Sequence, residues 1–379
     1  MADIIIAGYH GFANSGDEAL LLAILNTLRG KRPGLDVTVL SKTPEETARV
    51  YGVKSIFRYN IFKIIKEMKN SKMLLFGGGS LLQDVTSSKS VLYYLAVIWL
   101  AQKCGAKTML YANGVGPVVK RLNRRLTKRV LDKVDIITLR DDKSDEELKS
   151  LGVTKPQIVI TADPAFTIDA DVSLSGKYFT NMAGVPAGTR LCVISIRSWN
   201  KSVSNFEEEL AGLCDYMVDE HGLYPLFVPM QYPADLNISH RVIKRMKNPA
   251  YVINRELSVP EMFSVLSEAE IVVGMRLHSL IYATTLGIPA VALVYDPKVS
   301  AFMESMSQPD CVDVETFTCD AAKAVLNTII THREDRKEQL RKTNAVLKRV
   351  ADENGDYGIA LLDSCKEQSG YAARRRRRS

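Results

Sequence analysis

VVGMRLHSLIYATTLGIPAVALVYDPK, residues 272–298, has the pattern of a strand, a turn, a helix and a second strand. It opens in an apolar run rich in valine, breaks at MRLH, continues as the helix-length segment SLIYATTLG and returns to a second apolar run, IPAVALVY. Two short valine-rich runs on either side of a helix are typical of a parallel sheet that is buried on both faces.

The same alternation extends through both halves of the chain. In the first half it involves DIIIAGY, DVTVLS, KMLLFGGG and QIVITAD, and in the second half RLCVISIRSW, YPLFVPM, AYVIN and AEIVVGMR. With 379 residues the chain is also too long for one compact core. The sequence therefore predicts an α/β fold made of two Rossmann-like domains whose parallel sheets face a cleft.

The domain boundaries are predicted from where this alternation lapses. We expect an N-terminal α/β domain over 1–170, a linker over 171–189, where turn residues replace the periodicity, and a C-terminal α/β domain over 190–352. A last helix over 353–368, expected to pack back on the N-terminal domain, precedes a disordered basic tail over 369–379.

The net charge of +7 is concentrated at one end of the chain. Five of these charges are the arginines from Arg374 to Arg378, which leaves +2 for the rest. A nucleic-acid-binding surface needs a basic patch spread over a domain face, so no nucleic acid is expected as a partner. The arginine tail is either a solvated end, an added tail, or a peripheral contact with anionic membrane lipid.

Targeting, thiol and metal signals are weak. No apolar run reaches the roughly 18 residues of a membrane span, and Asp3 stands where a signal peptide would be basic, which predicts a cytoplasmic protein. The six cysteines form no C-x-x-C pair, so free thiols are expected. The five histidines are far apart in the sequence, and no metal site is expected.

Arg276 and His278 stand at the break after the strand AEIVVG. If MRLH is extended, alternation directs both side chains past the strand end, beside a helix capped by Ser279. A guanidinium binds carboxylates through paired hydrogen bonds, a helix start receives phosphate, and an imidazole transfers protons near neutral pH. A lone histidine is more often structural, but its coincidence with Arg276 favours a catalytic anion site.

Two further cations follow strands of the same predicted domain. Arg197 in SIRSW ends its first strand, and Lys298 in YDPK follows its last strong strand. Because the carboxyl ends of parallel strands lie at one edge of the sheet, Arg197, Arg276 and Lys298 would suit a small substrate with two or three negative charges. Taken singly, Arg197 or Lys298 could equally be a surface charge.

The N-terminal stretch GYHGFANSGDEALLLAIL, residues 8–25, joins a strand to a helix through a glycine-rich loop. Asn14, Ser15, Gly16 and Asp17 stand at the helix start, where backbone amides favour oxygen-rich ligands. The alternative is helix capping by Ser15 or Asp17 without a ligand. The spacing is not G-x-G-x-x-G and no acidic residue ends the second strand, so a nicotinamide cofactor is not expected.

LLFGGGSLLQD, residues 74–84, carries three glycines at a strand end. Gly78 and Gly79 would let the backbone approach either a ligand or a neighbouring backbone closely. No lysine follows in P-loop position, which argues against a nucleoside triphosphate site.

These motifs, together with ANGVGP, LRDDKSDEELKSLGV, TADPAF and above all GMRLHSLIYATTLGIPAVAL, resemble those of the polysaccharide pyruvyl transferases. The similarity covers residues 4–351 and is closest to bacterial enzymes that modify the secondary cell-wall polymer to which S-layer proteins are anchored. The resemblance implies a GT-B-like fold, phosphoenolpyruvate as donor and no cofactor. It also implies a 4,6-ketal of pyruvate on a β-ManNAc residue, either of a lipid-linked precursor or of finished polymer.

The resemblance implies roles for the candidate residues. The family's R-x-H element corresponds to Arg276 and His278, which we assign to the donor carboxylate and to proton transfer, and Arg197 and Lys298 would hold the phosphate. On the acceptor side, in the N-terminal domain, Asn14, Ser15 and Asp17 would hold the sugar, with Asp17 as a candidate base.

Two other functions remain open at this stage. MFSVLSEAEIVVG and YATTLGIPAVAL also look like parts of retaining GT-B glycosyltransferases, but Tyr282 stands where those enzymes commonly have the glutamate that holds the donor ribose. A non-catalytic polysaccharide-binding relative that keeps the fold is the other alternative. A glycosyltransferase would release a nucleotide, whereas a non-catalytic binding protein would release neither nucleotide nor phosphate.

Overall fold

The computed structural model of the chain describes residues 2–85, 88–169 and 175–376, and for Ser88 and residues 366–376 it describes the backbone alone. Contacts divide the chain into two compact units. Unit 1 comprises Met1–Phe12, Asp17–Ile168 and Leu347–Ser379, and unit 2 comprises Ala13–Gly16 and Asp169–Val346.

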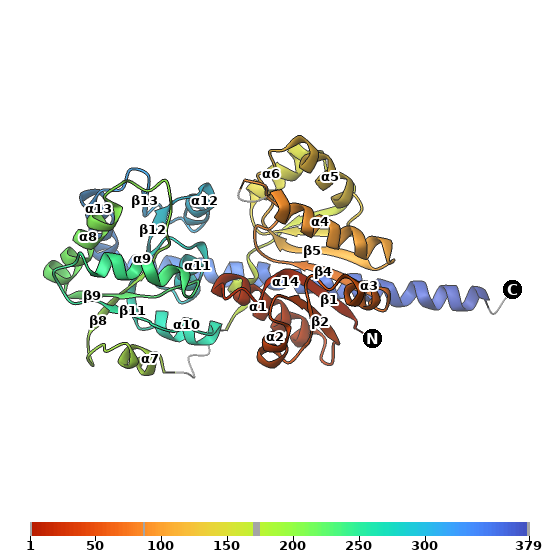
Figure 1. Ribbon diagram of the computed structural model, residues 1–379, viewed down its shortest axis with the longest axis horizontal. Coiled ribbons are helices and arrows are strands. Elements are labelled where there is room, and N and C mark those ends of the chain that lie inside the picture. Colours follow the sequence, from red (N-terminus) through yellow and green to blue (C-terminus); the bar gives the residue numbers. More distant parts are fainter. Residues whose placement is uncertain (1, 86–87, 170–174, 377–379) are drawn as a thin grey trace. The chain divides into compact units, whose positions relative to one another are not determined.

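Unit 1 contains a seven-stranded parallel sheet in the order β3-β2-β1-β4-β5-β6-β7 (Figure 1). Its strands are β1 (Ile4–His10), β2 (Val37–Ser41), β3 (Lys54–Phe57), β4 (Met73–Gly77), β5 (Lys107–Asn113), β6 (Ile136–Leu139) and β7 (Gln157–Ile160). The helices between and after them are α1 (Ser15–Lys31), α2 (Pro44–Tyr51), α3 (Ile61–Lys69), α4 (Ser88–Lys103), α5 (Arg121–Leu131), α6 (Asp142–Leu151) and the short 3₁₀ helix η1 (Pro164–Thr167).

Unit 2 contains a six-stranded parallel sheet in the order β10-β9-β8-β11-β12-β13. Its strands are β8 (Arg190–Ser195), β9 (Leu223–Phe227), β10 (Tyr251–Val252), β11 (Ala269–Gly274), β12 (Ala290–Val294) and β13 (Cys311–Asp313). Its helices are α7 (Gly176–Met182), α8 (Phe206–His221), α9 (Ala234–Ile243), α10 (Val259–Leu266), α11 (Leu277–Thr285), α12 (Pro297–Ser305) and α13 (Cys319–Thr331), and α14 (Arg333–Arg376) contributes to both units.

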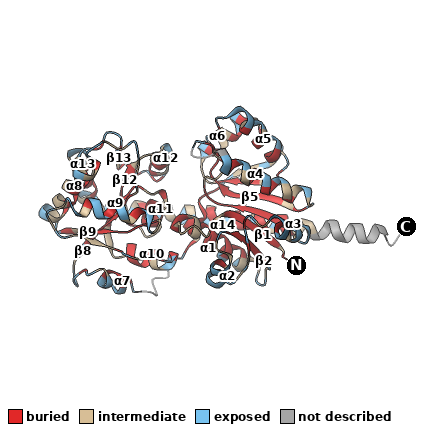
Figure 2. Ribbon diagram, in the orientation of Figure 1, coloured by how far each residue is buried: buried red, intermediate tan, exposed pale blue. Residues whose placement is uncertain are grey.

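The sheet of unit 1 is buried on both faces. Ile5 and Phe76 belong to one cluster of buried apolar side chains, whereas Ile4 and Leu75, the residues next to them, belong to another. Since alternate residues of a strand point to opposite faces, two clusters on the same strands require helices on each side of the sheet. The central strands of both units are accordingly buried in Figure 2, whereas the edge strands β3, β7 and β10 are partly exposed, and this agrees with the predicted parallel sheets.

Both sheets reverse their strand order at one point. In unit 1 the reversal lies between β1 and β4, and in unit 2 it lies between β8 and β11. The connections that leave two such strands run to opposite faces of the sheet, so the loops at their carboxyl ends separate and leave room for a ligand. A ligand site is therefore expected at the loops after β1, β4, β8 and β11.

The structure differs from the predicted domain organisation at three places. The predicted linker 171–189 contains helix α7, which packs against α10, and residues 170–174 lie outside the described residues. The helix predicted over 353–368 is part of a longer helix, α14, which begins at Arg333 and belongs to unit 1 from Leu347. This helix runs to Arg376 through the tail predicted as disordered, where alanine and arginine have high helix propensity; residues 377–379 lie outside the description.

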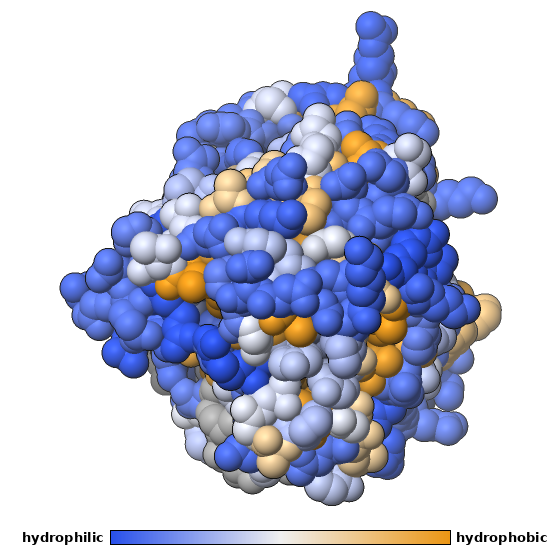
Figure 3. Space-filling model, turned by 90° about the vertical axis from the view of Figure 1, so that its left-hand side faces the viewer, coloured by the Kyte–Doolittle hydropathy of each residue, from blue (hydrophilic) through white to orange (hydrophobic). Residues whose placement is uncertain are grey.

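The surface shown in Figure 3 is mainly hydrophilic. Hydrophobic residues occur there in small groups between polar and charged side chains, as is usual for a face in contact with water. Within the described residues, no helix combines the length and apolar character needed to span a membrane.

Candidate functional site

The carboxyl ends of β8, β11 and β12 bring the predicted cations of unit 2 together at one edge of the sheet. Arg197 follows β8, Arg276 follows β11, and Lys298 lies in the first turn of α12 after β12. Because β8 and β11 are neighbours at the point where the strand order reverses, this is the edge at which parallel sheets bind ligands.

Arg276 is held by a carboxylate of the protein itself. Its Nε and Nη2 donate to the two carboxylate oxygens of Asp235 at 3.0 and 2.6 Å, and Nη2 also donates to Gln231 Oε1 at 3.0 Å. The Asp235 side chain is only 2% exposed and that of Arg276 13%. A buried guanidinium needs a counter-charge, and α9 supplies it. Nε and Nη2 of Arg276 are both occupied, and among its nitrogens only Nη1 makes no hydrogen bond with the described residues. The guanidinium therefore cannot bind a ligand carboxylate through the pair Nε and Nη2.

The turn after β11 is shorter than the sequence predicts. Helix α11 begins at Leu277 with Arg276 as its N-cap, so Ser279 is not the cap but a buried residue of the first turn, whose hydroxyl donates to Arg276 O at 2.6 Å. His278 is helical, and strand alternation does not align it with Arg276. The prediction of an extended MRLH segment is wrong because the helix is capped at Arg276, three residues earlier than expected.

The start of α1 is joined to unit 2 through residues 13–16. Asn14 forms an isolated antiparallel bridge with Gln231 and caps the helix, since its Oδ1 accepts a hydrogen bond from Gly16 N at 3.2 Å. Ser15 N donates to Met230 O at 2.9 Å, and the hydroxyl of Tyr282 donates to Ser15 O at 2.7 Å.

Ser15 and Tyr282 form a buried contact that the sequence did not predict. Their hydroxyl oxygens are 3.2 Å apart, and both residues are buried. Ser15 therefore tethers the helix start, and the expected role of Ser15 in holding a sugar is not supported by its position. Tyr282, at the place of the glutamate of glycosyltransferases, has a structural contact instead.

Gly16 lies directly against the imidazole of His278. A Cβ atom at position 16 would stand 2.2 Å from Nδ1 and 2.6 Å from Cγ of that ring. No side chain fits there without displacing the histidine, so the glycine of the NSG segment is required by this close approach. Two helix N-termini thus meet at His278, its own and that of α1.

Arg197 and Lys298 lie beside aromatic rings. The Cζ atom of Arg197 is 5.3 Å from the ring centre of Tyr295 and 5.8 Å from that of Trp199. Lys298 Nζ is 5.9 Å from the same tyrosine ring and 3.4 Å from the carboxylate of Asp296. Arg197 forms no ion pair with any residue that the structure describes.

In unit 1 the glycine loop after β4 faces the first turns of α1. Gly78 and Gly79 have positive φ angles of 65° and 75°, which favour glycine. A Cβ at Gly78 would stand 2.7 Å from Leu20 Cδ1, and one at Gly79 would stand 3.2 Å from Asp17 Oδ1. The predicted pair of glycines therefore lets the loop approach α1 and the carboxylate of Asp17.

Arg140 is a further buried cation that the sequence analysis did not select. It follows β6, its Nη1 lies 2.7 Å from Asp163 Oδ2, and its Nη2 donates to Ser80 Oγ at 2.8 Å. A Cβ at Gly114 would stand 2.5 Å from Ser80 Oγ and 3.3 Å from Arg140. The signal was present, since Arg140 directly follows a strand in TLRDD just as Arg197 does in SIRSW.

His10 and Arg58 form a second unpredicted pair in unit 1. Arg58 is 4% exposed, donates to Gly8 O at 3.3 Å and has the rings of Phe12, Tyr59, Tyr93 and Tyr94 within 4.5 to 5.4 Å. Burial, reinforced by the charge of Arg58, lowers the pKa of His10 to about 3. His10 is therefore neutral at physiological pH and unsuited to proton transfer there.

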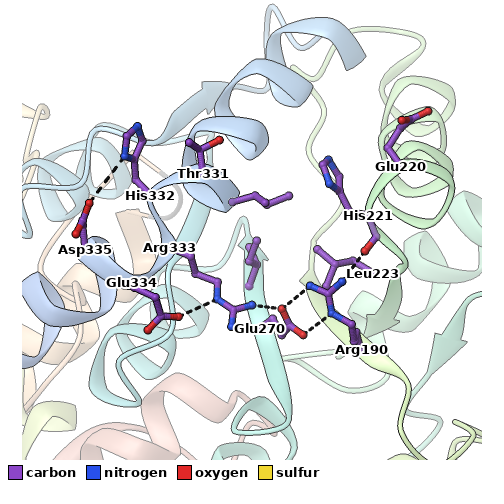
Figure 4. A pocket seen from close by; sticks show the side chains of 12 residues that line it. Arg190, Glu220, His221, Leu223, Glu270, Thr331, His332, Arg333, Glu334 and Asp335 are labelled. Carbon is purple, nitrogen blue, oxygen red and sulfur yellow. Dashed lines mark hydrogen bonds and ion pairs between the residues drawn. The ribbon is translucent and has the colours of Figure 1, made fainter.

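A cavity of about 640 Å³ lies at the opposite end of the unit 2 sheet (Figure 4). In it Glu270 pairs with both Arg190 and Arg333. Hydrogen bonds from Arg190, together with the charge of Arg333, hold the pKa of Glu270 below its ordinary value. Open parallel sheets bind ligands at the carboxyl ends of their strands and this network lies at the other end, so we assign it to stability.

All six cysteines are free, as predicted. Among the described residues, no group of three or more histidine, cysteine, aspartate or glutamate side chains could hold a metal ion.

Solved structures with the same architecture define the class of fold. MnaA of S. aureus, solved with UDP, is 12% identical with a TM-score of 0.66 over 95% of this chain and 98% of that one. UDP-GlcNAc 2-epimerase of Neisseria meningitidis is 12% identical with a TM-score of 0.63 over 96% and 100%. A glycosyltransferase of Rickettsia africae is 11% identical with a TM-score of 0.64 over 96% and 98%. The chain therefore has the predicted GT-B-like α/β fold.

Sequence comparison gives the family. Residues 14–297 match the polysaccharide pyruvyl transferase family. The amylovoran biosynthesis protein AmsJ of Erwinia amylovora is 21% identical over 398 residues, which covers 89% of this chain and 94% of AmsJ. The chain belongs to the polysaccharide pyruvyl transferase family and is a pyruvyl transferase that acts on a polysaccharide.

Proposed function

We propose that this pyruvyl transferase takes phosphoenolpyruvate as donor and forms a 4,6-ketal of pyruvate on a β-ManNAc residue of a lipid-linked precursor of a secondary cell-wall polysaccharide. The finished polymer would anchor S-layer proteins. The observation that carries the proposal is the group of cations at the carboxyl ends of β8, β11 and β12. Phosphoenolpyruvate is a compact anion with a carboxylate and a phosphate, and clustered cations favour such a donor.

The reaction balances without a cofactor. One acceptor hydroxyl oxygen bonds to C2 of phosphoenolpyruvate while a proton is delivered to the methylene carbon, which becomes a methyl group. The second hydroxyl oxygen then bonds to C2 as the bond from C2 to the phosphate oxygen breaks. The two hydroxyls lose two protons in total. One is offset by the proton added to the methylene carbon, and the other leaves on the phosphate.

Residues of unit 2 supply the donor contacts in this proposal. Arg197 and Lys298 would hold the phosphate, and the Nη1 group of Arg276 would reach the carboxylate while Asp235 fixes the guanidinium. Because Asp235 offsets the charge of Arg276 and Asp296 lies 3.4 Å from Lys298 Nζ, Arg197 would supply most of the net positive charge for the donor. His278 would deliver the proton to the methylene carbon as general acid or bind phosphate as an imidazolium ion.

Asp17 is our candidate for the acceptor hydroxyl. In unit 1 its carboxylate lies beside Gly79, since a Cβ atom at position 79 would stand 3.2 Å from Asp17 Oδ1. A carboxylate in the first turn of a helix is stabilised in its charged form and is a weak base, so Asp17 would orient the hydroxyl as well as accept its proton.

The experiment that tests the function is a phosphate-release assay. The protein is mixed with phosphoenolpyruvate and a synthetic lipid carrying a β-ManNAc disaccharide, and the product is analysed by mass spectrometry and NMR for a 4,6-ketal. Phosphate release that requires both substrates supports the proposal. Acceptor binding without turnover would favour the binding protein, and nucleotide release from a nucleotide sugar would favour the glycosyltransferase.

His278→Ala tests the assignment of the proton carrier. We expect turnover to fall by about 10² to 10⁴, the usual contribution of a general acid, with an unchanged far-ultraviolet circular dichroism spectrum. The matched control is His332→Ala, which replaces a histidine whose side chain is 58% exposed. Unchanged turnover in His278→Ala would remove this residue from the mechanism.

A further inference from the structure

Four side chains from two loops form a cluster at the carboxyl edge of the unit 2 sheet. Arg197 and Trp199 follow β8, while Tyr295 and Lys298 follow β12. These two strands lie on either side of β11, the strand that leads to His278. The cluster therefore lies on the two loops that follow the strands flanking β11.

Tyr295 contacts both cations of this cluster. Its ring centre is 5.3 Å from Arg197 Cζ and 5.9 Å from Lys298 Nζ, and both distances are within the range of cation–π attraction. Trp199 meets the tyrosine ring edge to face, with centres 5.0 Å apart and planes at 64°. One aromatic ring therefore holds two positive charges that would otherwise repel each other.

The cluster contains buried donors that no described residue of the protein accepts. Nε of Arg197 and the indole Nε1 of Trp199 are inaccessible to solvent and have no hydrogen-bond partner among the described residues. Leaving such N–H groups without an acceptor destabilises a folded protein, so buried donors are nearly always paired. Two orphaned donors next to two cations favour an anionic acceptor that is absent from the free protein.

We propose that Trp199 and Tyr295 complete an anion subsite with Arg197 and Lys298, in which Tyr295 is a positioning residue for both cations and the indole N–H of Trp199 donates to the anion. The inference rests on the proposed function, because in the transferase the anion is the phosphate of the donor. Aromatic rings place Arg197 without neutralising its charge, unlike the carboxylate that holds Arg276, whereas Lys298 has the carboxylate of Asp296 at 3.4 Å as well as the Tyr295 ring.

The chain offers a direct spectroscopic test, because it has only two tryptophans, Trp99 and Trp199. Trp99 is 49% exposed in unit 1, so Trp99→Phe leaves Trp199 as the single tryptophan without touching the subsite. The emission of Trp199 is then titrated with inorganic phosphate, with phosphoenolpyruvate and with pyruvate. We expect a saturable change with the first two and a much weaker one with pyruvate, which lacks phosphate. No change with phosphate or phosphoenolpyruvate would overturn the inference.

Variants of Tyr295 separate positioning from folding. Tyr295→Leu removes the ring, and we expect the dissociation constant for phosphate and the KM for phosphoenolpyruvate to rise about 3- to 10-fold, with kcat changed less than twofold. Tyr295→Phe keeps the ring and is the matched control, with values close to those of the parent. Equal affinities in the two variants would contradict the role of the ring.

A second substitution keeps the test valid where Tyr295→Leu fails to fold. Trp199→Phe retains an aromatic ring but removes the N–H donor, and we expect the KM for phosphoenolpyruvate to rise severalfold at nearly constant kcat. An unchanged KM would contradict the hydrogen bond. If phosphate changes the Trp199 emission but no pyruvyl transfer occurs, the proposed function fails and the anion subsite stands.

Discussion

Arg276 and Arg197 follow neighbouring strands of one sheet, yet their guanidinium groups have different surroundings. Arg276 forms two hydrogen bonds with the buried carboxylate of Asp235, whereas Arg197 lies between aromatic rings and forms no ion pair with a described residue. The first arrangement fixes a side chain and offsets its charge, and the second fixes a side chain and keeps its charge available. The sequence predicted that both arginines would contact an anionic donor, Arg276 at its carboxylate and Arg197 at its phosphate, and it did not indicate this difference in surroundings.

The Arg276–Asp235 pair leads to a stability prediction. Arg276→Ala or Asp235→Ala leaves one buried charge without its partner, and we expect each to lower the free energy of unfolding by about 3–5 kcal/mol. The double variant Arg276→Met with Asp235→Leu should recover most of that stability while remaining inactive. Urea denaturation followed by Trp199 fluorescence measures both; single variants within about 1 kcal/mol of wild type would show that the pair behaves like a surface ion pair.

His10 gives a pH dependence whose sign follows from its lowered pKa. The pKa is about 3 in the folded chain against 6.5 for an unperturbed histidine, so below pH 6.5 the unfolded chain binds a proton that the folded chain does not. Stability is therefore lost as pH falls from 6.5 toward 3, by up to about 1.4 kcal/mol per pH unit.

The measurement for His10 is a difference between two denaturation series. Wild type and His10→Gln are unfolded by urea at several pH values, and the variant should lose less stability on acidification. Carboxylates such as Asp84 and Asp132 have lowered pKa values, so the folded protein also loses stability when acid protonates them. Both proteins share this loss, and the difference between the two series therefore reports His10. Parallel curves for the two proteins would show that His10 does not titrate as described.

At the scale of helices and strands, the apolar runs predicted the strands well and the helix starts poorly. The apolar runs named from the sequence overlap β1, β2, β4 and β7 in unit 1 and β8 to β12 in unit 2, because buried parallel strands are nearly continuous in valine, isoleucine and leucine. The three-residue strand β13 was missed, since CVD carries too little pattern. Ser279 looked like a cap, but its hydroxyl bonds back to Arg276 O inside the helix.

The start of α1 gives a prediction at this scale. Gly16→Ala would place a methyl group 2.2 Å from Nδ1 of His278, so the imidazole must move, and we expect turnover to fall by about 100-fold. Gly30→Ala in the same helix is the matched control, because no atom lies within 4 Å of the added carbon. That control should keep full turnover and unfold at the same or a slightly higher temperature. Full turnover in Gly16→Ala would show that the position of the imidazole is not critical.

At the scale of the whole molecule, α14 is the element that returns the chain to unit 1. Leu361 and Leu362 belong to its buried apolar cluster, and the Asn354 side chain bonds to Thr161 Oγ1 at 2.8 Å and to Ala162 O at 3.3 Å. Lys31 of α1 pairs with Asp352 and Asp356 at 2.6 and 2.7 Å. Residues 351–362 of this helix therefore contribute buried side chains to the core of unit 1.

Two truncations test this role and the tail. Ending the chain after Val346 removes the buried leucines and Asn354, and we expect unit 1 to lose more than about 3 kcal/mol of stability. Deleting 374–378 alone should leave the melting temperature unchanged. If the arginines contact lipid, that shorter deletion also weakens binding to anionic vesicles at low salt without changing turnover on a soluble acceptor. A stable chain ending at Val346 would contradict the core role, and equal vesicle binding would dismiss the lipid contact.

The sequence by itself determined the α/β class, the two sheets, the family and the edge of each sheet at which polar residues gather, because these depend on periodicity and on residues adjacent in the chain. Only the tertiary structure decided that Asp235 holds Arg276, that Gly16 touches His278 and that Tyr295 lies beside Arg197 and Lys298. Each of these contacts joins residues far apart in the chain. A local pattern specifies how a segment folds. Packing decides which distant side chain offsets a charge and which residue lies against an aromatic or imidazole ring.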